Sequence, residues 1–174
     1  KNMTPERKQW WHDNCDPSVY LKNTKMPLLF VTGTNDFAYP LDSLLKTCDT
    51  PQGNVPTCIR LEMAHGHEAG WEPEEIGRFA DSILGDGIEL PEIGRLRVCP
   101  KYVQAEFTSK LPVKGYFLWT CDEGTWQERK WHQADAAISE STVKAAIPDC
   151  ATSFFLVVED RAGGYIISLP EIIC

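Results

Sequence analysis

The stretch Met26-Pro-Leu-Leu-Phe-Val-Thr-Gly33 decides the fold expected for the first half of the chain, because it is a continuous apolar run that ends at a glycine. Such a run is typical of a parallel strand buried on both faces. A short helix is expected over 41–48, a second strand over 58–63 and a longer helix over 73–84. Strands that alternate with helices predict an α/β layer with a parallel sheet over residues 1–88.

The helical period disappears from about Leu90 onward, and short apolar runs separated by turn residues replace it. This spacing predicts an antiparallel β-sandwich of immunoglobulin or fibronectin type III character over residues 92–174. The expected strands lie near residues 96–98, 103–107, 113–119, 143–147, 154–158 and 165–169. The expected fold class is therefore α/β followed by all-β, with the junction over residues 85–91.

Composition and charge exclude several classes of protein. Of the 174 residues, 43% are hydrophobic and 24% are charged, which fits a globular chain. The net charge is −8, and no stripe of Lys and Arg is present, so we expect no nucleic-acid partner. The longest apolar run is far below the roughly 20 residues that a membrane span needs. Residues 1–11 contain no signal-peptide or transit-peptide pattern, and we expect no membrane partner.

The seven cysteines do not form a CxxC pair or another zinc-site spacing. In an oxidising compartment Cys48 and Cys58 are candidates for a disulfide; otherwise the cysteines are buried thiols. An odd number leaves at least one thiol unpaired. No cofactor is expected, and the location stays unknown, with the periplasm or the extracellular space favoured.

An acid and a histidine follow the two expected strands of the first half: Asp36 comes after the first strand and His67 after the second. In an open parallel sheet, functional groups collect at the carboxyl ends of the strands. The order acid then histidine is that of the last two members of a Ser-Asp-His triad. In such a triad the imidazole takes the proton of the serine, and the carboxylate fixes the imidazole tautomer. The alternative role for Asp36 is that of a turn-forming aspartate.

Two motifs carry a resemblance to a known family: Asp36-Phe-Ala-Tyr-Pro-Leu-Asp-Ser43 and Gly66-His-Glu-Ala-Gly-Trp-Glu-Pro73. With them, the segment Pro27–Leu84 resembles the C-terminal end of the catalytic domain in α/β-hydrolases of the prolyl oligopeptidase and acetylxylan esterase-like type. Some bacterial esterase-like members carry a β-sandwich after that domain. The resemblance implies that Asp36 is the triad acid and His67 the triad histidine.

The chain departs from that family in two respects. It has no Gly-x-Ser-x-Gly elbow for a nucleophile, and it supplies only about two strands of the parallel sheet. We therefore expect a C-terminal fragment of a serine hydrolase, an esterase or peptidase, that is inactive alone. The intact protein would act on a small-molecule or carbohydrate ester or on a peptide. The open strand edge predicts self-association.

Three further residues near the expected site are not part of the triad. Tyr39 and Trp71 are candidates for substrate binding, or they pack the loops onto the sheet. His65 is expected to be a loop residue that contacts the catalytic side chains without taking part in the reaction. On extended backbone His65 and His67 point the same way, as in an HxH metal pair, but no compact set of further ligands is evident and no metal is expected.

The alternative function is a non-catalytic binding module that acts through the β-sandwich on a carbohydrate or protein partner. Its basis is a group of aromatic residues in the second half. The group consists of Tyr116, Phe117, Trp119, Trp126 and Trp131. Alternation along the strand places Tyr116 on one face and Phe117 and Trp119 on the other, so at least one tryptophan is expected in the core.

Overall fold

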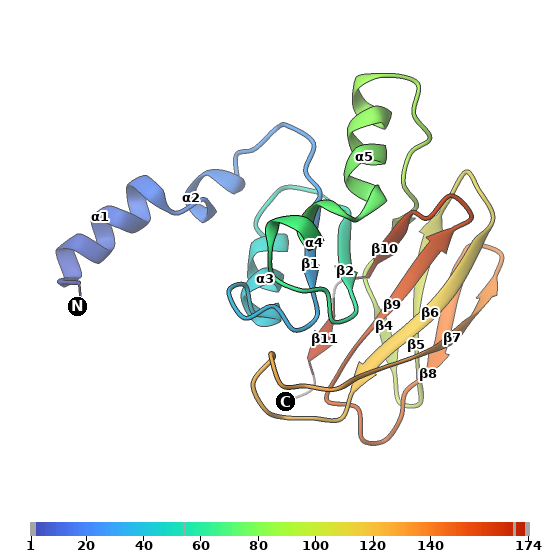
Figure 1. Ribbon diagram of the computed structural model, residues 1–174. Helices are drawn as coiled ribbons and strands as arrows, with labels where there is room; N and C mark the ends of the chain where they lie inside the picture. Colours follow the sequence, from blue (N-terminus) through green and yellow to red (C-terminus); the bar gives the residue numbers. More distant parts are fainter. Residues whose placement is uncertain (1–2, 54, 169, 173–174) are drawn as a thin grey trace.

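The computed structural model describes residues 3–53, 55–168 and 170–172. Strands account for 33% of these residues and helices for 23%, so the protein is predominantly β. A two-stranded parallel sheet with its helices lies beside a nine-stranded antiparallel sheet (Figure 1).

The first half contains one strand–helix–strand unit. β1 (Phe30–Gly33) pairs in parallel with β2 (Thr57–Arg60), and α3 (Leu41–Cys48) lies between them in the chain. Leu41 and Cys48 are the buried residues of this helix. Two further helices follow β2: α4 (His67–Trp71) and α5 (Glu74–Leu84). Because the strands are parallel, the loops after β1 and β2 leave the sheet at the same edge.

An N-terminal arm precedes β1 and was not expected from the sequence. It consists of α1 (Pro5–Cys15) and α2 (Ser18–Leu21) and extends away from the rest of the molecule (Figure 1). The side chain of Thr4 caps α1 by accepting a hydrogen bond from the backbone N–H of Arg7. No residue of α1 is buried, which is why apolar periodicity did not reveal this helix.

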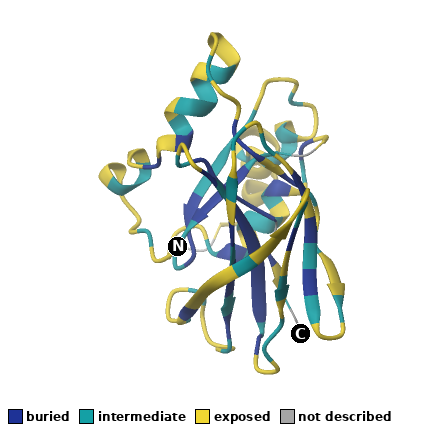
Figure 2. Ribbon diagram, turned by 90° about the vertical axis from the view of Figure 1, so that its right-hand side faces the viewer, coloured by how far each residue is buried: buried dark blue, intermediate teal, exposed yellow. Residues whose placement is uncertain are grey.

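The second half forms a mostly antiparallel and nearly closed sheet. Its strands are β3 (Glu92–Ile93), β4 (Arg97–Cys99), β5 (Tyr102–Thr108), β6 (Val113–Thr120), β7 (Trp131–Ser139), β8 (Thr142–Ala146), β9 (Ser153–Asp160), β10 (Tyr165–Ile167) and β11 (Glu171–Ile172). They run in the order β10-β9-β6-β7-β8-β5-β3, and β4 and β11 pair with β5 and β9. The core lies along β9, where the five residues from Phe154 to Val158 have no exposed surface (Figure 2).

Buried carboxylates connect α5 to both sheets. Glu75 accepts hydrogen bonds from the guanidinium of Arg60, at 2.6 Å, and from the backbone N–H of Tyr165, at 2.8 Å. One turn later, Arg78 pairs with the buried carboxylate of Asp160 at the end of β9. The division into domains at 1–88 and 92–174 stays a prediction. The contacts of α5 with Tyr165 and Asp160 join these two parts of the chain.

The expected α/β-hydrolase portion is wrong. Among the described residues only β1 and β2 are parallel, helices are few, and the sheet is otherwise antiparallel. A short strand–helix–strand unit with polar loops produces both motifs that carried the resemblance, and such a unit does not require a larger parallel sheet. The hydrolase class therefore loses the support of the fold.

The fold class expected for the whole chain is wrong, because the protein is predominantly β. The strands of the second half form one mostly antiparallel, nearly closed sheet, and the immunoglobulin-like sandwich stays a prediction for this half. Alternation along a strand identifies its two faces but not its neighbours, so the closure was not predictable. The strand β7 was missed because its residues 132–135 are all exposed and show no apolar alternation.

Candidate functional site

The loops after β1 and β2 bring an acid and a histidine into contact. Asp36 follows β1 and His65 follows β2, and the parallel pairing places both loops at one edge of the sheet. The Nδ1 atom of His65 lies 2.9 Å from Oδ2 of Asp36. The pair therefore has the spacing of a hydrogen bond between an imidazole and a carboxylate.

The carboxylate of Asp36 is almost completely buried, at 7% exposure, and it is held from two sides. Its other oxygen, Oδ1, accepts hydrogen bonds from the backbone N–H of Ala38 and Tyr39, at 2.8 and 2.9 Å. Burial acts to raise the pKa of Asp36, but the hydrogen bonds from His65 and from these two N–H groups outweigh it and lower the pKa below its ordinary value. Asp36 is therefore a carboxylate at neutral pH.

The ring of His65 is partly exposed, and the carboxylate sets its orientation. When the ring is neutral, the contact with Asp36 requires the proton on Nδ1 and leaves the lone pair of Nε2 free. The edge of the ring packs against Phe37, with 4.8 Å between the centroids, and Tyr39 lies 6.1 Å away. These contacts hold the ring while Nε2 stays available to accept a proton.

A hollow of about 450 Å³ opens beside the pair. Its lining consists of Val31, Thr32, Asp36, Tyr39, Leu44, Met63, Ala64, His65, Gly66, His67, Gly70 and Trp71. Tyr39 and Trp71, the residues expected to bind substrate, both line the hollow and are largely exposed. His67, the expected triad histidine, also lines it as the first residue of α4, but its ring makes no side-chain hydrogen bond within the described part of the chain.

The hollow lacks a nucleophilic side chain. No Ser or Cys occurs among the described residues that line it, and Thr32, its only hydroxyl apart from Tyr39, is 5% exposed. Over residues 3–53, 55–168 and 170–172, no group of three or more His, Cys, Asp and Glu side chains is placed to hold a metal ion. The arrangement can therefore transfer a proton, but it needs a nucleophile from elsewhere.

The cysteines have two different states. A disulfide joins Cys121 to Cys150, a pair that sequence spacing did not suggest. Cys48 and Cys58 are buried free thiols and do not form the disulfide considered for them. Burial raises the pKa of Cys48 to about 11 and that of Cys58 to about 12, so neither is a reactive thiolate at neutral pH.

The aromatic residues of the large sheet lie in different surroundings. Trp131 is buried against Phe155, and Trp119 stacks on Phe117 and on His132. Trp126 lies in the loop after β6, with the guanidinium of Arg129 over its ring. Tyr116 is partly buried, and sugar binding by this group stays a prediction of the sequence.

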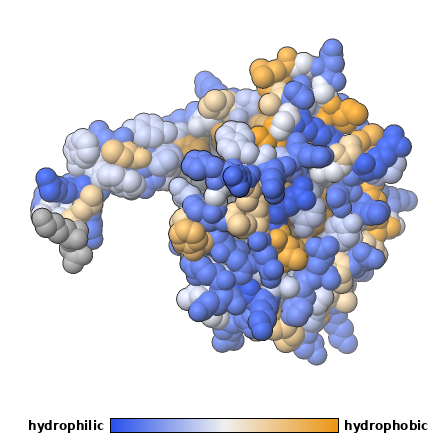
Figure 3. Space-filling view, viewed as in Figure 1, coloured by the Kyte–Doolittle hydropathy of each residue, from blue (hydrophilic) through white to orange (hydrophobic). Residues whose placement is uncertain are grey.

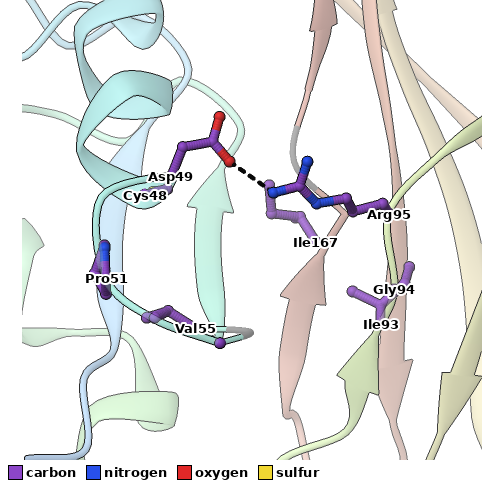
Figure 4. Close-up of a pocket in the computed structure, with 9 residues that line it drawn as sticks. Cys48, Asp49, Pro51, Val55, Ile93, Gly94, Arg95 and Ile167 are labelled. Atoms are coloured by element: carbon purple, nitrogen blue, oxygen red, sulfur yellow. Dashed lines mark hydrogen bonds and ion pairs between the residues drawn. The ribbon is translucent and has the colours of Figure 1, made fainter. Parts of the chain in front are cut away.

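A second hollow of about 480 Å³ lies between the loop after α3 and the strands β3 and β10 (Figure 4). An ion pair between Asp49 and Arg95 crosses it, with 3.1 Å between the charged atoms. Both side chains are mostly exposed, so water screens this pair strongly. The hollow presents no reactive group and is not the stronger candidate.

Comparison of the chain with known protein families found no match, and comparison with curated proteins found none either. The site therefore rests on its own geometry. No helix in the described parts of the chain has the length and apolar character required to cross a membrane.

Proposed function

We propose that the hollow beside β1 and β2 is a general acid–base site in which Asp36 orients His65. The contact of 2.9 Å between the carboxylate and Nδ1 is the observation that supports this role. A fixed carboxylate stabilises the imidazolium that forms when Nε2 accepts a proton, and the imidazole then returns that proton to a leaving group.

The lining of the hollow restricts which group can give a proton to His65. Proton transfer to Nε2 requires a hydroxyl group or a water molecule as donor, and the lining of the hollow supplies no serine for this purpose. Cleavage of an ester or peptide by a serine from outside this chain stays a prediction of the sequence. Tyr39 and Trp71 would contact the apolar part of a small substrate.

The tautomer of His65 tests this proposal. Long-range ¹H–¹⁵N spectra of the labelled protein distinguish a proton on Nδ1 from a proton on Nε2. We expect the neutral ring of His65 to carry its proton on Nδ1 and Asp36→Ala to remove that preference, because the acceptor is lost. His67→Ala is the matched control and should leave the spectrum of His65 unchanged. A proton on Nε2 in the unmodified protein would contradict the proposal.

A second candidate function, an interaction module, is supported by apolar surface that nothing covers in the described chain. Trp10 and Trp11 of α1 are 63% and 47% exposed, and Leu84 at the end of α5 is 87% exposed. Figure 3 shows hydrophobic side chains gathered at the end of the molecule that carries α5. Exposed apolar side chains that gather on one part of a surface are typical of protein contacts.

The side of β1 that faces away from β2 also supports the function of an interaction module. Within the described residues β1 pairs only with β2, so its other edge has unpaired backbone groups. We expect two copies to associate through this edge and the arm. Sedimentation velocity over a range of concentrations measures the association, and Trp10→Ser combined with Trp11→Ser should weaken it. A monomer at high concentration would remove the support for this function.

A further inference from the structure

The loop between β6 and β7, residues 121–130, reaches across the molecule to the turn that holds the acid. Asn35 lies in that turn, and its side-chain amide nitrogen faces three backbone carbonyl groups of the loop. It lies 2.7 Å from the carbonyl oxygen of Arg129 and 3.2 Å from those of Trp126 and Gln127. Residues separated by more than 90 positions in the chain are thus joined at the edge of the site.

The oxygen of the same amide connects this loop to the histidine. The hydroxyl of Thr34 donates to Oδ1 of Asn35 at 2.6 Å and accepts from the backbone N–H of Glu62 at 3.0 Å. Glu62 lies three positions before His65 in the loop after β2. Both functional groups of Asn35 are therefore used, and they join the loop 121–130 to both loops of the acid–base pair.

The loop 121–130 has its own supports. The disulfide ties Cys121, the first residue of this loop, to Cys150 in the connection between β8 and β9. The hydroxyl of Thr152, in the same connection, donates to the carbonyl oxygen of Asp122 at 2.7 Å. The guanidinium of Arg129 lies over the ring of Trp126, 3.8 Å from the centroid. Cys150 is exposed, so a reductant can reach the disulfide.

We propose that Asn35 is a positioning residue, and that the loop 121–130, which the disulfide ties to the connection between β8 and β9, acts through it to keep Asp36 against His65. The importance of this for catalysis rests on the proposed function, but the positioning is measurable without it. A catalytic pair must be held to within a fraction of an ångström by the groups around it. Asn35 makes three hydrogen bonds between the loop and the turn, and Gln127 adds a longer one, from its side-chain amide to the carbonyl oxygen of Phe37 at 3.5 Å.

The test uses the tautomer of His65 as its measurement. We compare the unmodified protein with Asn35→Ala and with the double variant Cys121→Ser, Cys150→Ser. Each change should abolish the fixed Nδ1–H tautomer and give averaged ring shifts. Arg95→Ala, which breaks the exposed ion pair of the second hollow, is the control and should change nothing. The backbone amide spectrum of β9 shows in each case that the core is still folded.

Chemical reduction provides the same test when a variant does not fold. A dithiol reductant reduces the disulfide between Cys121 and Cys150 by thiol–disulfide exchange: both cysteines gain a hydrogen, and the reductant closes its own disulfide. We expect the His65 signature to be lost on reduction and to return on reoxidation.

The outcomes separate the two proposals. A signature absent from the unmodified protein would remove the acid–base function itself. A signature that is present there, and that persists in Asn35→Ala and after reduction, would overturn the positioning role while the acid–base function stands.

Discussion

Replacement of Arg78 by Ala should destabilise the protein strongly, because it leaves a buried carboxylate without its counter-charge. The guanidinium of Arg78 binds the two oxygens of Asp160 in parallel, at 2.8 and 2.6 Å. The side chain of Asp160 has no exposed surface, and that of Arg78 is 13% exposed. Removal of one partner from such a pair costs about 3–5 kcal/mol, out of a total stability of roughly 5–15 kcal/mol.

Urea unfolding followed by tryptophan fluorescence measures this loss. With a slope of about 2 kcal/mol per M, the midpoint should fall by about 1.5–2.5 M. Lys110→Ala is the matched control, because Lys110 pairs with Glu89 at 3.0 Å while both side chains are about two-thirds exposed. An exposed pair of this kind contributes about 0–1 kcal/mol, so its loss should hardly move the midpoint.

The result that would refute this reasoning is a loss below about 1 kcal/mol for Arg78→Ala, equal to that of the control. If Arg78→Ala does not fold, Asp160→Asn replaces it, since this change removes the charge but keeps the shape of the side chain. The number of transitions is also informative. A single unfolding transition, both in the unmodified protein and in Arg78→Ala, would indicate that residues 1–88 and 92–174 unfold together.

Three further predictions follow from the site and its surroundings. The pKa values of Asp36 and Asp160 are lowered in the folded state. The stability that these two carboxylates contribute to the protein is therefore complete above about pH 5 and is lost as the pH falls through their folded pKa values. The urea midpoint should be lower at pH 3 than at pH 6, and the drop should be smaller in Asp160→Asn. A Cβ atom at Gly33 would overlap the carbonyl oxygen of Met63, so Gly33→Ala should destabilise the protein by about 1–3 kcal/mol, whereas Gly70→Ala, with open space around it, should not; thermal unfolding measures both, and equal midpoints would contradict the packing. A fluorophosphonate probe should leave the intact mass unchanged, because no serine occurs among the described residues that line the hollow. A mass increase of one probe would show that a serine elsewhere in the chain is activated.

The choice of histidine shows where local sequence reasoning ended. Spacing to the following helix favoured His67, but the structure brings His65 to Asp36. Both histidines line the hollow, although His65 lies in a bend and His67 begins α4, so the extended backbone expected between them is not present. The turn after β2 decides which ring reaches the carboxylate, and this turn is held by Thr34, which follows the other strand. A residue 28 positions away in the chain is not visible in a local motif.

The helices α3 and α5 show the same limit of local sequence reasoning. The apolar residues of α3 predicted its buried face, and Leu41 is buried as expected for such a helix. In α5, Leu84 continues the apolar period of Ile76 and Phe79, yet Leu84 is largely exposed and Glu75 is buried. An apolar stripe shows which face can be buried, but only a neighbouring element buries it, and none of the described elements covers the end of α5.

Local sequence patterns were sufficient to place the strand that ends at Gly33, the helices α3 and α5, most strands of the second half and the acid after β1. These features depend on apolar period and turn residues within short windows of sequence. Other features could be seen only in the folded chain: the strand order, the near closure of the large sheet, the pairing of Asp36 with His65 and the contact of loop 121–130 with Asn35. Each of these is a contact between residues far apart in the chain, and its energy depends on burial and geometry that no local window contains.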